Sequence, residues 1–96
     1  MLPMTPREKE AVVQAARLLR DMGASQVFMF GSAAKGQLRP DSDIDMAVSG
    51  LPPRVYFSAV NQASELVGRP VDLMDLDDDT PLVRYIRASG DLVRVD

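Results

Sequence analysis

Several features that would place a protein in a particular class are missing from this sequence of 96 residues. It contains no cysteine, which fits an intracellular protein. No apolar run approaches the roughly 20 residues that a membrane-spanning helix requires, so no membrane association is predicted. The opening stretch MLPMTPREKE has no basic segment followed by an apolar one, so no secretory signal is predicted and a cytoplasmic location is expected.

The sequence also lacks an excess of basic residues. It has 11 Lys and Arg against 14 Asp and Glu, a formal net charge of -3. A broad nucleic-acid surface is therefore not expected, because such binding depends on neutralising phosphates. Binding of a nucleotide through a bridging metal ion stays open. No repeat, low-complexity segment or linker interrupts the chain, so residues 1–96 are predicted to form a single domain.

The hydrophobic pattern predicts alternating helices and strands. Thr5-Pro6-Arg7-Glu8 has the form of a capping box, and apolar residues at helical spacing follow it until Gly23. Helices are predicted over residues 6–22, 54–67 and 81–89, and strands over 27–30, 43–48, 71–76 and, as a short edge strand, 92–95. Residues 31–42 are predicted to be a turn-rich connector with one helical turn at 32–35.

This order of elements predicts an α/β or α+β sandwich of two layers. A small sheet is expected to have helices on one face. The other face is then left free for a functional site.

Two aspartates are expected to point off that free face. Asp43 and Asp45 are two residues apart on a strand, so both side chains leave the same face, roughly 6.5–7 Å apart along the chain. Carboxylates this close repel each other, and a hard divalent cation removes that penalty. An open pair of carboxylates suits Mg²⁺ whose coordination is completed by the phosphates of a nucleoside triphosphate.

Asp72 is the candidate third carboxylate. It lies near the start of the third predicted strand and would converge with Asp43 and Asp45 if the two strands are neighbours. Three carboxylates allow two metal ions, which stabilise the attacking and leaving oxygens of an in-line displacement at phosphorus. Asp72 is also placed to accept the proton of an attacking hydroxyl. The pattern predicts phosphoryl or nucleotidyl transfer.

The turn after the first strand supplies candidate phosphate contacts. Gly31 allows a tight backbone turn, and the Ser32 hydroxyl and the amides that follow can donate to phosphate oxygens. Lys35 lies in the same predicted turn and is placed to contact the leaving pyrophosphate.

Other interpretations of these residues fit less well. A calcium loop beginning at Asp41 requires Gly and Glu where the sequence has Met46 and Pro52. A P-loop beginning at Gly31 requires Lys and then Ser or Thr where Gln37 and Leu38 stand. The run of three aspartates at 77–79 is predicted to be a solvated turn before the last helix.

Taken together, Gly31-Ser32, Asp43-Ile44-Asp45 and Val71-Asp72-Leu73 resemble the nucleotidyltransferase superfamily that includes DNA polymerase β. The compact chain resembles the minimal nucleotidyltransferases, antitoxin-type proteins paired with HEPN-domain toxins. The resemblance implies a mixed sheet, Asp43, Asp45 and Asp72 as metal ligands, and Gly31 and Ser32 as phosphate contacts. Lys35 stands where this family often has arginine, so the positive charge is kept but the forked, two-donor geometry of the guanidinium is lost.

The resemblance also implies a reaction and a partner. The reaction is Mg²⁺-dependent transfer of a nucleoside monophosphate, AMP from ATP, to a hydroxyl of a HEPN-type toxin. The alternative is an antitoxin that neutralises its partner by binding alone. A surface that only binds a partner gains nothing in affinity from clustered like charges, so the cluster favours the interpretation as an enzyme. The sequence does not determine the acceptor or the base specificity, and homo-oligomers stay open.

Overall fold

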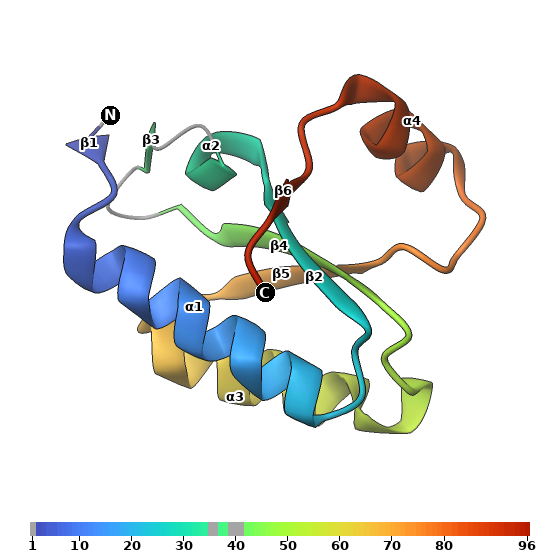
Figure 1. Cartoon of the computed structure of the whole chain (residues 1–96), viewed down its shortest axis with the longest axis horizontal. Coiled ribbons are helices and arrows are strands. Elements are labelled where there is room, and N and C mark those ends of the chain that lie inside the picture. The colour runs from blue at the N-terminus through green and yellow to red at the C-terminus, as the bar shows by residue number, and fades with distance from the viewer. Residues whose placement is uncertain (1, 35–36, 39–41) are drawn as a thin grey trace.

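Three helices and a four-stranded sheet make up most of the structure, a computed structural model that describes residues 2–34, 37–38 and 42–96 (Figure 1). The main helices are α1 (Pro6–Asp21), α3 (Tyr56–Val67) and α4 (Pro81–Ser89). The sheet contains β2 (Gln26–Phe30), β4 (Ile44–Ser49), β5 (Val71–Asp75) and β6 (Val93–Arg94). The short elements are β1 (Leu2–Pro3), α2 (Gly31–Ala34), β3 (Gln37–Leu38) and η1 (Pro53–Val55). The predicted elements are confirmed to within a few residues, whereas the small sheet of β1 and β3 was not predicted.

Helix α1 begins at the predicted capping box. The Thr5 Oγ1 accepts a hydrogen bond from the backbone N–H of Glu8 at 3.1 Å, and a Glu8 carboxylate oxygen accepts one from the Thr5 N–H at 3.0 Å. These bonds satisfy two donors that a helix start would otherwise leave unpaired. The helix buries Val12, Ala15, Ala16 and Leu19.

The sheet is mixed, as the resemblance implied. Its strand order is β5-β4-β2-β6, with β4 parallel to β5 and the remaining neighbours antiparallel. The parallel pair is possible because α3 carries the chain from the end of β4 back to the start of β5. This register places Asp45 of β4 opposite Phe30 of β2 on one side and opposite Asp72 of β5 on the other.

Alternate residues of the strands face two different layers. Helices α1 and α3 lie side by side against one face, where the main core includes Leu19, Val27, Ile44, Met46 and Val48 (Figure 1). These residues are almost inaccessible to solvent. This arrangement confirms the predicted α/β class.

Helix α4 lies on the opposite side of the sheet from α1 and α3 (Figure 1). Its Val83 packs with Ala47 and Leu76 in a second core. The partly buried residues Phe28, Phe30, Met74 and Leu92 surround that core. The predicted free face is therefore only partly open, because its apolar side chains are covered by α4 and the carboxylates lie beyond them.

The run of aspartates before α4 differs from the predicted solvated turn in one residue. Asp77 accepts hydrogen bonds from the Ser49 hydroxyl at 2.7 Å and the Gly50 backbone N–H at 2.6 Å. These two bonds lower the pKa of Asp77. Asp77 therefore ties the β5–α4 connection to the turn after β4.

No helix within the described ranges is long and apolar enough to cross a membrane.

Candidate active site

Asp45 lies at the centre of the predicted site. Its Cα is paired with Phe30 of β2 and with Asp72 of the parallel strand β5. Since paired residues on neighbouring strands point to the same face, the Asp45 and Asp72 carboxylates leave the sheet together, away from α1 and α3. Asp43 precedes β4 by one residue and is exposed, as is Asp72, whereas Asp45 is half-buried.

The electrostatics of Asp45 show that the three aspartates are close enough to interact. Partial burial is the largest cause that raises the pKa of Asp45 above its ordinary value of 3.8. The negative charges of Asp72 and then of Asp43 raise that pKa further. A carboxylate so placed prefers a nearby cation or a proton.

Gly31 joins the turn after β2 to these carboxylates. Its φ of +71° is left-handed, and a Cβ built at this position would overlap the Oδ2 of Asp45. The contact exists because Gly31 directly follows Phe30, the residue that pairs with Asp45. The glycine is therefore required twice, by the backbone conformation and by the approach of the carboxylate.

The other two predicted phosphate contacts are described only in part. The backbone of Ser32 lies in α2, but its side chain is outside what the structure describes. Lys35 lies outside the described residues altogether. Their roles stay predictions.

The carboxylates of Asp43, Asp45 and Asp72 are ligands of the type that Mg²⁺ prefers, but they do not form a complete coordination shell. Within the described ranges, no group of three or more His, Cys, Asp or Glu side chains is arranged so that it could hold a metal ion. Mg²⁺ is commonly held by one or two carboxylates and completed by waters and substrate phosphates. Asp45 and Asp72, with Asp43 beside them, meet that requirement, since each supplies carboxylate oxygens on one face of the sheet.

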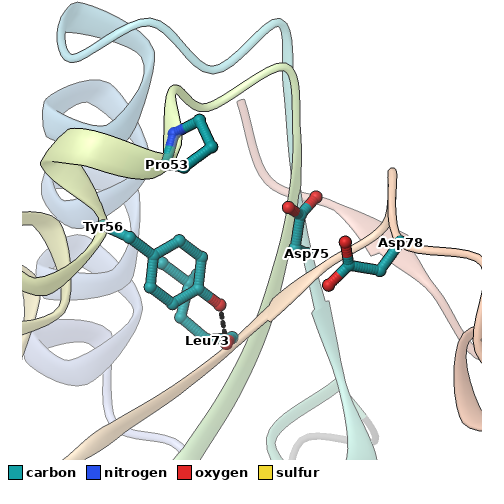
Figure 2. A pocket seen from close by; sticks show the side chains of 5 residues that line it. All are labelled: Pro53, Tyr56, Leu73, Asp75 and Asp78. Carbon is teal, nitrogen blue, oxygen red and sulfur yellow. Dashed lines mark hydrogen bonds between the residues drawn. The ribbon is translucent and has the colours of Figure 1, made fainter.

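A pocket at the outer edge of β5 was not predicted. It has a volume of about 500 Å³ and is lined by Pro53, Tyr56, Leu73, Asp75 and Asp78. In Figure 2 the Tyr56 ring lies on one side of the pocket and the Asp75 and Asp78 carboxylates on the other. The Tyr56 hydroxyl donates a hydrogen bond to the Leu73 carbonyl (Figure 2).

Tyr56 remains protonated at neutral pH. Burial, followed by the charges of Asp75, Asp72 and Asp78, raises its pKa to about 12. The hydroxyl therefore caps a carbonyl of an edge strand, which would otherwise be open to pairing with another chain. No sequence signal identified the partner of the Tyr56 hydroxyl.

Comparisons with known proteins agree with this geometry. The family model described as "Polymerase beta, Nucleotidyltransferase" matches residues 16–94. No curated protein matches the sequence significantly.

Solved structures share the fold. One, a toxin–antitoxin with AMP-PNP, has a TM-score of 0.70 and 22% identity, over 92% of this chain and 72% of the other. Another, assigned as a minimal nucleotidyltransferase, has a TM-score of 0.69 and 27% identity, over 88% and 86%. A third comes from the complex of a tri-AMPylated Shewanella oneidensis HEPN toxin with an MNT antitoxin, with a TM-score of 0.67 and 20% identity, over 93% and 71%.

Proposed function

Because the chain belongs to the polymerase β nucleotidyltransferase family, whose model matches most of it, we propose that it transfers AMP from ATP to a hydroxyl group. The acceptor is a side chain of a HEPN-type toxin, and the protein acts as the antitoxin of that toxin. Mg²⁺ and a nucleoside triphosphate are the cofactor and the substrate.

One observation carries the proposal. The register of β4 and β5 places Asp45 beside Asp72, and the side chain of Asp45 lies against the backbone of Gly31. The turn that is predicted to hold phosphate and the carboxylates that are predicted to hold metal therefore meet at one place. Placing the carboxylates together beside this turn does not stabilise the fold, because carboxylates that repel each other destabilise it. Their clustering therefore supports a functional role.

The residues divide the chemistry among them. Asp43, Asp45 and Asp72 are the side chains that would hold Mg²⁺, whose charge, when it is bound, offsets that of the phosphate oxygens. Gly31 and Ser32 contact the phosphates of the nucleotide, and Lys35 meets the pyrophosphate end.

Asp72 accepts the proton of the acceptor hydroxyl as its oxygen attacks the α-phosphorus. A bond forms between that oxygen and the α-phosphorus. The bond from the α-phosphorus to the bridging oxygen breaks, and pyrophosphate leaves. Asp72 suits this role because it is exposed at an edge strand, where an acceptor can reach it.

The partner is proposed from the structural relatives. The MNT antitoxin of Shewanella oneidensis occurs in a complex with a tri-AMPylated HEPN toxin, and another toxin–antitoxin structure contains AMP-PNP.

The test uses the protein purified with a co-expressed HEPN-type partner, ATP and Mg²⁺. Intact-mass spectrometry is expected to show the partner gaining the mass of AMP. Asp43→Asn is expected to abolish the gain, because the substitution removes a carboxylate charge without changing the shape of the side chain. Asp21→Asn, at the exposed end of α1, is the matched control and is expected to leave the gain unchanged. Parallel reactions with the other nucleoside triphosphates measure base specificity.

Two outcomes contradict the proposal. The partner gains no mass with any nucleoside triphosphate, or Asp43→Asn modifies it as fast as the unaltered protein does. If the toxin is still neutralised under the first outcome, the protein is an antitoxin that acts by binding alone.

A further inference from the structure

Two consecutive residues, Arg69 and Pro70, form hydrogen bonds with the residues immediately before and after Asp43. The Arg69 Nη1 donates a hydrogen bond to the Ser42 carbonyl at 3.1 Å. The Ile44 backbone N–H donates to the Pro70 carbonyl at 3.0 Å. Asp43 lies between these two bonds, so residues 69 and 70 limit how far its backbone can move.

The same two residues lead directly into β5. Val71 is paired with Ile44, and its N–H donates to the Ser64 hydroxyl of α3 at 3.0 Å. Asp72 follows and is paired with Asp45. Residues 69–72 therefore hold the segment around Asp43 and also present the third carboxylate, while α3 anchors them.

Arg69 is itself oriented by α1. Its Nη2 contacts the Glu8 Oε2 at 3.1 Å, and the two side chains are only 20% and 27% exposed. The other carboxylate oxygen of Glu8 accepts the N–H of Thr5 in the capping box. The planar guanidinium can bond to Glu8 and to the Ser42 carbonyl at once, which the single ammonium group of lysine does poorly.

We propose that Arg69 is a positioning residue. By linking Glu8 of α1 to the Ser42 carbonyl, it sets the place of the Asp43 carboxylate relative to Asp45 and Asp72. Its side chain need not touch the nucleotide. The inference rests on the proposed function, because the geometry that it maintains matters for the transfer of a nucleotide.

The test combines amide exchange with kinetics. Arg69→Gln is expected to speed hydrogen exchange of the Ile44 amide, measured by NMR, because the neighbouring bond to Ser42 is lost. Its kcat for nucleotide transfer is expected to fall roughly tenfold to a hundredfold, the usual effect of losing a group that orients metal ligands. The KM for ATP is expected to change less, because misplaced ligands weaken binding of the transition state more than binding of the substrate.

Three further variants make the result specific. Arg69→Lys is expected to recover part of kcat, since it retains one donor and the charge. Glu8→Gln still accepts the Thr5 N–H but loses the ion pair, so it is expected to act in the same direction and more weakly. Arg17→Gln, at an exposed position of α1, is the control and is expected to change neither measurement.

Two results would overturn the inference. One is an Arg69→Gln protein in which Ile44 exchange and kcat are both unchanged. The other is an equal rise in exchange at Leu76, whose amide donates to the Val48 carbonyl far from Arg69, because that would indicate general destabilisation. If the unaltered protein transfers no nucleotide, the proposed function fails, whereas Ile44 exchange still decides whether Arg69 holds the segment.

Discussion

Substitution of Gly31 by alanine tests the contact on which the site depends. The change adds a single methyl group at a residue whose φ is +71°. That methyl group would overlap the Oδ2 of Asp45 and would lie 3.4 Å from its Cγ. The substitution therefore introduces backbone strain and also forces the Asp45 carboxylate away from the turn.

The two effects have different magnitudes. A left-handed conformation costs an alanine about 1–2 kcal/mol of folding free energy. The overlap involves the end of a short, half-buried side chain, so Asp45 is expected to relieve it by rotating. Holding a side chain off its preferred rotamer costs about 0.5–1.5 kcal/mol. Rotation also displaces the carboxylate from its place beside Asp72, and a misplacement of about 1 Å can lower the rate of a catalysed reaction about a hundredfold.

Gly68 provides a matched control for the backbone term. Its φ is +80°, and a Cβ built there meets no atom within 4 Å. Gly68→Ala is thus expected to cost about 1–2 kcal/mol, and Gly31→Ala about 0.5–1.5 kcal/mol more. Urea denaturation measures both free energies of unfolding, and mass spectrometry of the partner measures the loss of nucleotide transfer, which only Gly31→Ala is expected to show.

A double-mutant cycle isolates the contact. When Asp45→Ala is added to Gly31→Ala, the overlap disappears, so the double variant is expected to be more stable than the sum of the single effects by about 0.5–1.5 kcal/mol. The reasoning is refuted if Gly31→Ala is no more destabilising than Gly68→Ala and the cycle shows additivity. Asp45 would then not lie against the turn.

Two further predictions concern groups outside the site. Asp96 accepts hydrogen bonds from Arg94, the Val27 N–H and Arg20, which hold its pKa well below the ordinary 3.8. Stability from this group is present above pH 3.8 and is lost as the pH falls further, so Asp96→Asn is expected to cost about 1 kcal/mol at pH 7, since solvent screens the exposed arginines. The free energies of unfolding of the unaltered protein and of Asp96→Asn should converge at low pH, and a difference that stays constant with pH would refute the assignment. Tyr56→Phe removes the bond to the Leu73 carbonyl and is expected to cost about 0.5–1.5 kcal/mol at pH 7. In a Tyr85→Phe background, the remaining phenol is expected to titrate with a pKa of about 12, and its stabilisation is lost as the pH rises through that value; titration near 10 would contradict the burial of the hydroxyl.

Much of the fold could be predicted because its signals are local. The capping box at Thr5 and Glu8 involves residues three apart, and the structure contains both of its bonds. Apolar residues recur at helical spacing over α3, and two of them, Ala59 and Ala63, are buried. The apolar residue Leu66 follows the same spacing, yet it is 43% exposed.

The site was predictable in its components but not in its assembly. Alternation along β4 put Asp43 and Asp45 on one face, and the Gly31-Ser32 turn was recognisable from residue types. The support from Arg69 was missed, since it joins residues 27 and 61 positions away. The cover of α4 over the carboxylate face was missed for a similar reason, as a helical pattern does not tell which face of a sheet the helix will cover.

The sequence by itself determined, to within a few residues, where the main helices and the strands of the four-stranded sheet begin and end, because caps, glycines and hydrophobic periods act locally. It also determined which side chains share a face of each element. Only the tertiary structure decided that Asp72 pairs with Asp45, that Asp45 lies against Gly31, and that residues 69 and 70 hold Asp43. These relations depend on strand register and helix packing, which follow from burying all the apolar surfaces of the chain at once.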